Sequence, residues 1–362
     1  MILSADLLDR QLTAIFTAWG MRPDQIADTV RVMLYADLSG IDSHGVSMMP
    51  AYHRIRAEGK LTMAAVVRVV RQTPVTALVD AGGGLGHAAG VFAMNLAVER
   101  CAGLGIAAVG VRNSNHYGAA GFYARMAAER GFIGIATTSS WKASIVPTFG
   151  SKPMFGTNPI AFAAPAGRNP PFVMDFATST AAIGKFTLAH RAGKKIPEGW
   201  ALGADGNPTT DPKVGLDLRL LTPLGGTREQ GSHKGYGLAA MVDILSATLN
   251  GGSFAATREE RYGKEARFNI GHFFLALNPA MFREDGEFIA EMDHMIDALR
   301  AVKPAEPGQP VLVHGDPEET ARQERMTKGI PVADSLVEEL REIARACNAP
   351  DLIGGRSRTG SA

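Results

Sequence analysis

The fold is decided by residues 76–138, which read TALVDAGGGLGHAAGVFAMNLAVERCAGLGIAAVGVRNSNHYGAAGFYARMAAERGFIGIATT. Apolar runs of strand length alternate here with alanine-rich segments of helical spacing. Strands are therefore expected at 76–84, 105–114 and 132–140, and helices at 91–105 and 120–131. Short connections between alternating strands and helices are typical of a mixed α/β domain.

Helical patterns flank this region toward both ends of the chain. Ser4 is the expected N-cap of an amphipathic first helix that Gly20 ends. Further helices are expected at 24–40, 51–59, 235–252, 286–302 and 333–347, and short strands at 64–72 and 273–277. A stretch rich in Gly, Pro, Asp and Thr, residues 198–234, is expected to be mostly loop, and residues 302–319 a proline-rich connection.

The composition excludes several classes of protein. Of the 362 residues, 46% are apolar and 20% are charged, with 37 Lys and Arg against 36 Asp and Glu. Such a chain can bury a full core, and its balanced charge gives no footprint for nucleic acid or an anionic membrane. No segment reaches the ~18 apolar residues of a membrane span, and the acidic N-terminus argues against a signal peptide. We expect a cytoplasmic protein.

The two cysteines, Cys101 and Cys347, cannot form a disulfide scaffold or ligate a structural zinc by themselves. Both lie in alanine-rich helical contexts, and we interpret them as buried thiols. The histidines other than His44 and His116 show no metal-ligand spacing, so no metal site is expected.

The segment GLGHAA (84–89) matches the G-x-G-x-x-A form of the dinucleotide fingerprint. That fingerprint also needs an acidic residue at the end of the next strand, to bind the ribose. The next strand ends instead in Arg112 and Asn113. We therefore interpret GLGHAA as a structural glycine turn rather than as part of a Rossmann domain.

Two other glycine-rich sites are candidates for chemistry. His116 follows a predicted strand and precedes a helix, where it is either a general acid/base or a hydrogen-bonded turn histidine. Lys234 lies between Gly231 and Gly235 at a helix start, which is either an anion site or a solvated lysine. Asp175 ends an apolar strand and could bind ribose hydroxyls or cap the next helix.

Six motifs that follow one another along the chain resemble, as a set, the motifs of one known family, although each motif alone is common. They are GIDSHGV (40–46), NSNHYGAAGFYA (113–124), GTNPIAFAAP (156–165), VMDFATS (173–179), IPEGWAL (196–202) and HKGYGLA (233–239). In this order they resemble the malate/L-lactate dehydrogenase family of the non-Rossmann type, which includes ureidoglycolate, sulfolactate and diketogulonate oxidoreductases and Δ1-piperideine-2-carboxylate reductases. The resemblance runs from the first helix to about Arg341.

The resemblance implies a mixed α/β fold with a large, mostly antiparallel sheet of non-Rossmann type and a helical layer from both termini. It divides the chain into a helical region with the DSHG corner (1–75), a mixed-sheet NAD(P)-binding region (76–290), C-terminal helices that pack back (291–350) and a flexible tail (351–362). It also implies an NAD(P)-dependent oxidoreductase that acts on the carbon beside a carboxylate, and a homodimer.

The resemblance assigns roles to individual residues. His116 looks like the acid/base on the substrate oxygen, with Ser43 and His44 as catalytic partners. The expected cofactor-binding residues are His116, Tyr117, Gly118, Ala119, Ala120, Asp175, Phe176, Ala177, Thr178, Lys234 and Gly235. The expected substrate-binding residues are Met48, Tyr52, Lys142 and Asn158. The cofactor is NAD or NADP, and the substrate is a small 2-hydroxy or 2-oxo acid.

One position departs from the family pattern. Relatives often read HGVxR, with the arginine on the substrate carboxylate, whereas this chain reads HGVSM and places Met48 there. Another cation, Lys142 in preference to Arg54, could bind the carboxylate, or backbone N–H groups could. The substrate could also carry an apolar group that packs on Met48, Met49 and Trp141.

Three other functions remain open from the sequence. An imine reductase acting on a cyclic imino acid such as Δ1-piperideine-2-carboxylate needs the same proton and hydride. A cofactor-binding protein without turnover is compatible with the missing arginine. A hydrolase using Ser43 and His44 lacks the G-x-S-x-G elbow that would support it.

Overall fold

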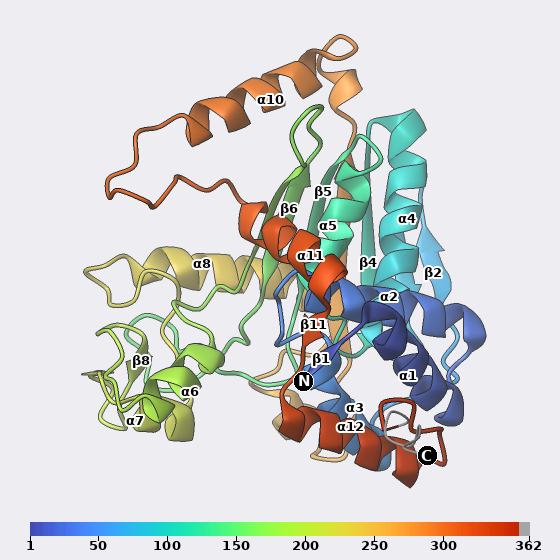
Figure 1. Ribbon diagram of the computed structural model, residues 1–362, viewed down its shortest axis with the longest axis vertical. Coiled ribbons are helices and arrows are strands. Elements are labelled where there is room, and N and C mark those ends of the chain that lie inside the picture. The colour runs from blue at the N-terminus through green and yellow to red at the C-terminus, as the bar shows by residue number, and fades with distance from the viewer. Residues whose placement is uncertain (355–362) are drawn as a thin grey trace, which may run out of the picture.

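A seven-stranded mixed sheet forms the centre of the molecule in the computed structural model, which describes residues 1–354 (Figure 1). The strand order is β2-β3-β4-β10-β5-β6-β7. These strands span Arg68–Gln72 (β2), Thr76–Asp80 (β3), Ile106–Ser114 (β4), Ile133–Thr138 (β5), Ile160–Ala164 (β6), Phe172–Phe176 (β7) and Ile270–Leu277 (β10). Only β3 and β4 pair in parallel, and the other five pairs are antiparallel.

The position and direction of strand β10 distinguish this sheet from the parallel sheet of a doubly wound fold. It comes late in the chain, yet it lies between β4 and β5 and pairs antiparallel with both. A Rossmann sheet would be mostly parallel throughout. The expected mostly antiparallel sheet of non-Rossmann type is therefore confirmed.

The two faces of the sheet are covered by different helices. Helices α4 (Gly86–Leu104) and α5 (Ala120–Ala128) pack on one face around Val109, Tyr123 and Phe274. The opposite face receives α8 (Ser232–Asp243) and the π-helical turn Ile244–Thr248 that continues it. Two glycines allow this close packing. A Cβ at Gly271 would lie 1.8 Å from the Ser246 carbonyl oxygen, and a Cβ at Gly110 would lie 1.9 Å from the Asn250 Oδ1 just after the turn.

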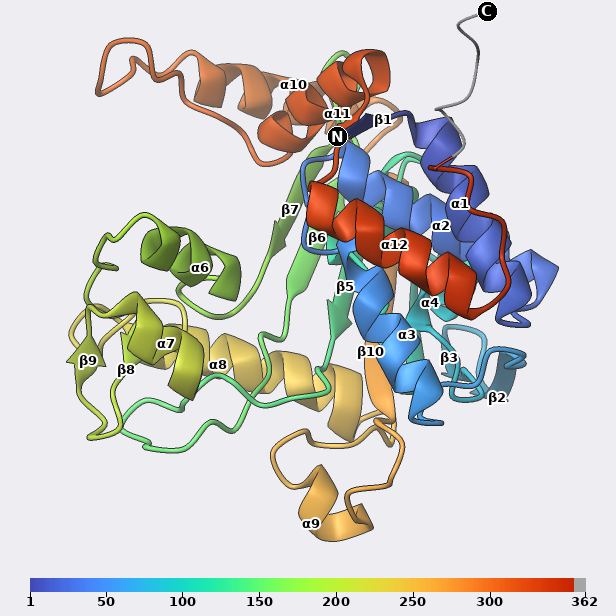
Figure 2. The ribbon, with the colours of Figure 1, turned by 60° about the horizontal axis from the view of Figure 1, so that its bottom comes forward.

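Both ends of the chain contribute to one helical layer beside the sheet. Its helices are α1 (Ala5–Ala18), α2 (Pro23–Leu38), α3 (Met49–Ala57) and α12 (Asp334–Ala346), and Figure 2 shows α12 lying across α3. Leu8, Tyr52 and Leu340 lie in their common core. Strand β1 (Ile2–Leu3) pairs with β11 (Ile330–Pro331), so the two ends meet directly. The predicted helical layer from both termini is confirmed.

A small lobe (residues 180–231) extends from the sheet around Phe186 and Leu221 (Figure 1). It contains α6 (Ile183–Arg191), β8 (Ala201–Leu202), β9 (Pro208–Thr209) and α7 (Pro212–Leu218). The remaining elements are α9 (Arg258–Tyr262), α10 (Glu287–Arg300), α11 (Asp316–Lys328) and the 3-10 turns Val46–Met48 and Pro279–Met281.

Several local predictions differ from the structure. The expected loop at 198–234 contains β8, β9 and α7, and the expected strand at 64–72 is ordered as a strand only over β2. Helix α11 lies partly in the expected proline-rich connection 302–319; its proline and acidic first turn are typical of a helix start, but it has no buried apolar stripe that would predict its length. Within residues 1–354 no helix is long and apolar enough to cross a membrane. The predicted flexible tail 351–362 lies outside the described residues from residue 355 onward.

Candidate active site

His116 lies where the sheet, the helical layer and α4 meet. It follows β4 in the turn that leads into α5 and is partly exposed. Its Nδ1 lies 2.7 Å from the Tyr52 hydroxyl of α3 and 3.3 Å from the backbone nitrogen of Gly118. Its ring stacks on Trp141 at 5.7 Å and on His44 at 5.4 Å between centroids. Segments far apart in sequence therefore converge on one imidazole.

The surroundings keep His116 neutral. Burial lowers the pKa of His116 well below its ordinary value, and His44, His87 and His272 lower it further. Burial also lowers the pKa of His87 to about 3. A neutral imidazole can accept a proton, which is one requirement for a general base.

The DSHG corner (residues 42–45) brings Ser43 and His44 to His116. The Ser43 hydroxyl lies 2.7 Å from Nδ1 of His44, and burial lowers the pKa of His44. Asp42 points elsewhere, because its carboxylate pairs with Arg325 of α11. The three neighbours Asp42, Ser43 and His44 therefore do not form a hydrolase triad, which needs the acid on the histidine.

Asp37, near the end of α2, fixes the position of this corner. Its carboxylate accepts a hydrogen bond of 2.9 Å from the backbone N–H of Val46. It also fills the space beside Gly45, where an added Cβ would lie 1.9 Å from the Asp37 Oδ1. Burial raises the pKa of Asp37 to about 7, in spite of the opposing Val46 hydrogen bond. Arg325 donates to the Asp37 carbonyl and so ties α11 to the same corner.

Asp175 caps α5, and not the helix that follows it in sequence. Its carboxylate accepts a hydrogen bond of 2.6 Å from the Gly121 backbone N–H in the first turn of α5. Burial raises the pKa of Asp175 to about 6. Of the two roles predicted for this acid, capping is thus realised on a different helix, next to the turn that carries His116.

The other expected cofactor residues differ in how far their side chains are exposed to solvent. The side chains of Tyr117, Ala119, Ala120 and Thr178 are buried, whereas Phe176 and Ala177 are partly exposed. The Tyr117 ring stacks on His272 at 4.6 Å between centroids, inside the core. Any contact of Tyr117 with a cofactor would therefore have to come from its backbone.

The start of α8 carries the second glycine-rich site. Gly231 is its N-cap with a φ of 102°, and Lys234 is exposed in the first turn. A cavity of about 760 Å³ borders this end, lined by residues 146–151, 226–230 and Ser232 among others. Gly235 does not open the backbone to a ligand, because a Cβ there would lie 2.2 Å from the Leu224 carbonyl oxygen.

The expected substrate residues do not all line one surface. Met48, Trp141 and Phe268 are each partly buried against the core of the helical layer, and the rings of Trp141 and Phe268 lie 5.5 Å apart. Met49 is fully buried and cannot meet a substrate. Asn158 is buried too, and its amide donates to the Ala239 carbonyl and to Asp243.

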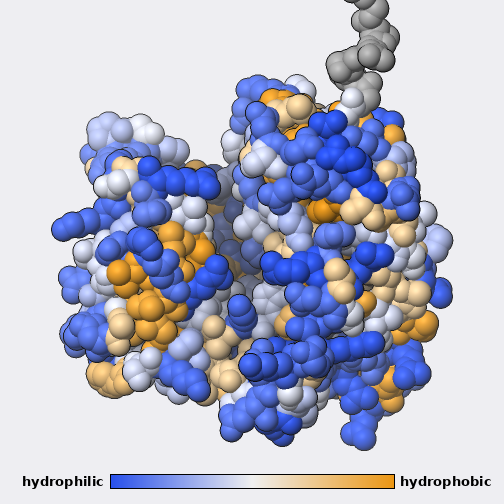
Figure 3. All heavy atoms as spheres, turned by 90° about the horizontal axis from the view of Figure 1, so that it is seen from below, coloured by the Kyte–Doolittle hydropathy of each residue, from blue (hydrophilic) through white to orange (hydrophobic). Residues whose placement is uncertain are grey.

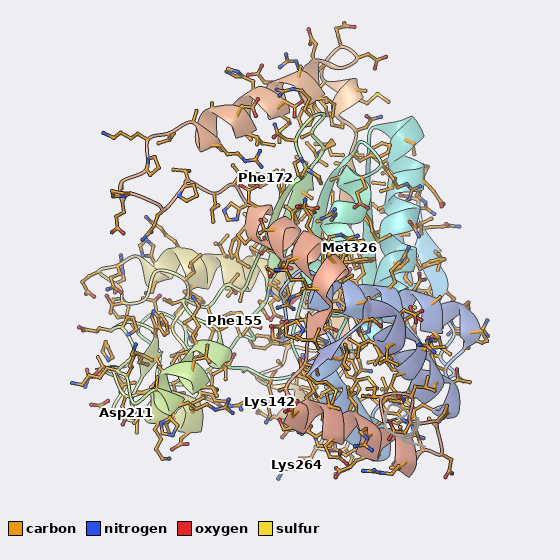
Figure 4. The ribbon with its side chains drawn as sticks, in the orientation of Figure 1. Lys142, Phe155, Phe172, Asp211, Lys264 and Met326 are labelled. Carbon is orange, nitrogen blue, oxygen red and sulfur yellow. The ribbon has the colours of Figure 1, made fainter. Side chains whose placement is uncertain are left out.

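Lys142 follows Trp141 and is exposed. Figure 4 places it between the small lobe and the side of the molecule formed by α12. Seen from below, the surface is hollowed between these two parts (Figure 3).

Sequence reasoning missed His87, Asp37 and Phe268 as parts of this site. His87 belongs to GLGHAA, a segment whose glycines predict a structural turn and give its histidine no role. Asp37 was detectable as a lone acid in the apolar end of a helix, a position where an unpaired charge is costly. Phe268 had no local signal, because only tertiary packing brings it to Trp141.

The comparisons with known proteins point to one family. Residues 3–341 match the family model for malate/L-lactate dehydrogenase. A malate dehydrogenase of Pyrococcus abyssi is 40% identical over 86% of both chains. The malate dehydrogenase structure from Entamoeba histolytica has a TM-score of 0.91 at 32% identity, covering 97% of this chain and 99% of that one. The Δ1-piperideine-2-carboxylate reductase structure from Pseudomonas syringae has a TM-score of 0.82 at 30% identity, covering 95% and 100%.

The raised pKa of Asp37 makes a prediction about stability. Between pH 4 and 7 the unfolded carboxyl is ionised while the folded one keeps its proton, so the free energy of unfolding falls as pH rises. Asp37→Asn removes this penalty and keeps an acceptor for Val46. Its free energy of unfolding relative to the native protein should therefore rise across this window, by up to about 4 kcal/mol. Urea unfolding at several pH values measures it.

Asp351→Asn is the control of opposite sign. Burial works against ionisation of Asp351, but Arg341 and the Gly354 N–H bring its pKa below the ordinary value. This variant should lose relative stability as pH rises through the region near 4. A relative stability of Asp37→Asn that does not change with pH would contradict the assignment.

Proposed function

Because this chain belongs to the malate/L-lactate dehydrogenase family, we propose that it transfers a hydride between a nicotinamide cofactor, NAD or NADP, and the α-carbon of a small 2-hydroxy or 2-oxo acid. The observation that carries the proposal is His116: a neutral, partly exposed imidazole held by Tyr52, His44 and Trp141. A hydroxy acid dehydrogenase needs one such group.

His116 is the acid/base in this proposal. In the oxidation direction its ring nitrogen accepts the hydroxyl proton of the hydroxy acid, and the C–H electron pair leaves the α-carbon as hydride. In the reduction direction the imidazolium returns the proton to the oxygen. Proton transfer by a positioned group contributes about 10²–10⁴-fold to such a rate. The bound nicotinamide supplies the hydride acceptor or donor.

The start of α8 fits the phosphates of such a cofactor. The positive end of a helix dipole favours an anion; at this start the Ser232 and Lys234 N–H groups already donate to the Thr227 and Gly231 carbonyls, so the dipole and the side chains carry the argument. Here the N-cap is a left-handed glycine, Gly231, with no capping side chain, and Lys234 is exposed beside it. Arg228, which donates to His233, adds a second cation at the same end. Gly231 and Lys234 are therefore better candidates for phosphate binding than Gly235.

The walls near His116 favour an apolar substituent on the substrate. The Trp141 ring stacks on the imidazole and lies 5.5 Å from the Phe268 ring between centroids, and Met48 is partly buried against the core of the helical layer. Lys142 is then the cation for the carboxylate common to all 2-oxo acids. This assignment replaces a bidentate arginine by a point charge, which binds a carboxylate with less directional control.

A homodimer is the assembly that we propose. Helix α8 and its π-helical continuation expose an apolar stripe in which Met241, Ile244 and Leu249 are 41%, 58% and 63% exposed. These residues lie about one helical turn apart and so share one side of the helix. A second copy of this chain that covers the stripe would remove this apolar surface from water.

The reaction class can be tested by following 340 nm absorbance with NADH and NADPH. The panel should contain 2-oxo acids with apolar and carboxylate side chains, together with cyclic imino acids. We expect turnover of apolar 2-oxo acids with at least one coenzyme. His116→Gln should lose about 10²–10⁴-fold in kcat while coenzyme still raises the melting temperature.

Two outcomes of this panel would contradict the proposal. Reduction of imino acids alone would favour the imine reductase. Coenzyme binding without turnover of any panel member would favour a binding protein. Full activity of His116→Gln would remove the acid/base assignment.

Substrate recognition gives a second prediction. Lys142→Ala should raise KM for every 2-oxo acid by roughly tenfold or more, because a hydrogen bond to a charged group is lost, and should leave the coenzyme KM unchanged. Lys152→Ala, which removes an exposed lysine elsewhere, is the matched control. Met48→Arg should shift preference from apolar to dicarboxylic 2-oxo acids. An unchanged KM in Lys142→Ala would exclude this lysine.

The dimer can be measured by sedimentation velocity. The native chain should sediment as a dimer, and Ile244→Glu should shift it toward monomer, because a buried, unpaired carboxylate is costly in an apolar interface. Met326→Glu on α11 changes another exposed apolar residue (Figure 4) and should leave the dimer intact. A monomeric native chain would contradict the assembly.

A further inference from the structure

The Tyr52 hydroxyl lies between two histidines. Tyr52 is fully buried on α3, and its oxygen is 2.7 Å from Nδ1 of His116 and 3.4 Å from Nε2 of His87. His87 is also fully buried, and its Nδ1 has no hydrogen-bond partner among the described residues. The Tyr52 hydroxyl is therefore the polar link between His87 and the nitrogen of His116 that faces inward.

The direction of these hydrogen bonds follows from Gly118. Its backbone N–H approaches Nδ1 of His116 at 3.3 Å and can only donate. Nδ1 therefore carries a lone pair in this arrangement, and the Tyr52 hydroxyl donates to it. The neutral ring then carries its proton on Nε2. The Tyr52 oxygen is left to accept from Nε2–H of His87.

This resting arrangement cannot by itself exchange a proton with a substrate. To act as a base at Nε2, the ring needs its lone pair there and its proton on Nδ1. The imidazolium likewise carries a proton on Nδ1. In both forms Nδ1–H needs an acceptor, and the Gly118 N–H cannot be one. The Tyr52 oxygen has two lone pairs, so it can accept this bond while it still accepts from Nε2–H of His87.

We propose that Tyr52 is a positioning residue that lets His116 switch between its two neutral tautomers and its imidazolium, with His87 as the second partner of the hydroxyl. The switch passes through the imidazolium: the His116 ring takes up one proton from solvent at Nδ1 and gives up one at Nε2 to solvent or substrate, while Tyr52 and His87 keep their own protons. Its use in turnover rests on the acid/base role proposed for His116.

The groups around His116 make this partner necessary. The titratable residues that face it from neighbouring segments are His44, His87 and His272, and each of these lowers its pKa. None of these neighbours compensates the positive charge of an imidazolium. A hydroxyl that accepts from Nδ1–H stabilises this charged form more than it stabilises the neutral one, because hydrogen bonds to charged groups are stronger.

The first test is histidine-ring NMR of the ligand-free protein, which needs no turnover. The native His116 should show an unprotonated Nδ1 and a protonated Nε2. Tyr52→Phe should lower the pH at which His116 becomes imidazolium by about one unit. Tyr123→Phe is the matched control, because it removes another buried tyrosine hydroxyl whose partner is the Tyr117 carbonyl. It should leave the titration of His116 unchanged.

The second test is the kinetic comparison of the same variants in the reduction direction. Above the pKa of His116, each unit by which that pKa falls removes about nine-tenths of the imidazolium. Tyr52→Phe should therefore reduce kcat near pH 7 by roughly tenfold and displace the pH profile. The KM values for the 2-oxo acid and for the coenzyme should stay within about twofold of the native values.

The outcomes separate this proposal from its rivals. A native His116 with its proton on Nδ1 would overturn the assigned hydrogen bonds, whether or not Tyr52→Phe folds. A raised KM for the acid with an unchanged titration of His116 would make Tyr52 a substrate ligand instead. If no substrate is turned over, the proposed function fails, and the NMR titration still decides the role of Tyr52.

Discussion

The close packing of Gly86 against the turn that carries His116 is the constraint on which the site depends. The Gly86 N–H donates to the His116 carbonyl at 2.9 Å. A Cβ at Gly86 would lie 2.5 Å from the Asn115 carbonyl oxygen and 2.7 Å from Nε2 of His272. Only glycine permits this approach, which brings the start of α4 into contact with the backbone at His116. The GLGHAA segment thus supports an imidazole through its glycine and its histidine.

The polar part of this site is assembled almost entirely from neutral groups. His116, His87 and Tyr52 are joined by single hydrogen bonds and ring contacts, and His272 stacks on Tyr117 nearby in the core. Burial of an ionised partner beside His116 would be expensive, and a carboxylate there would raise the pKa of the imidazole. The neutral surroundings instead keep it unprotonated, so the strength of His116 as a base depends on which of its neighbours can accept a hydrogen bond.

Local patterns in the sequence were enough for the elements that surround His116. The alternation over residues 76–138 predicted β3, α4, β4, α5 and β5, and the motif order predicted the mostly antiparallel sheet. The insertion of β10 between β4 and β5 has no local signal, because strand order is set by contacts distant in sequence. The same holds for Asn158 and Tyr117, whose motifs predicted contact with a ligand although packing places their side chains in the core.

The change at Met48 shows how specificity can move on a constant framework. Residue 48 precedes α3 directly, and its side chain is partly buried against the core of the helical layer. An arginine there would present a fixed fork to a carboxylate, whereas methionine presents a flexible apolar surface. Among the described residues the Met48 side chain makes no hydrogen bond to His116, Tyr52 or His87, so in the proposed mechanism we expect a substitution at residue 48 to change the choice of substrate more than the proton chemistry.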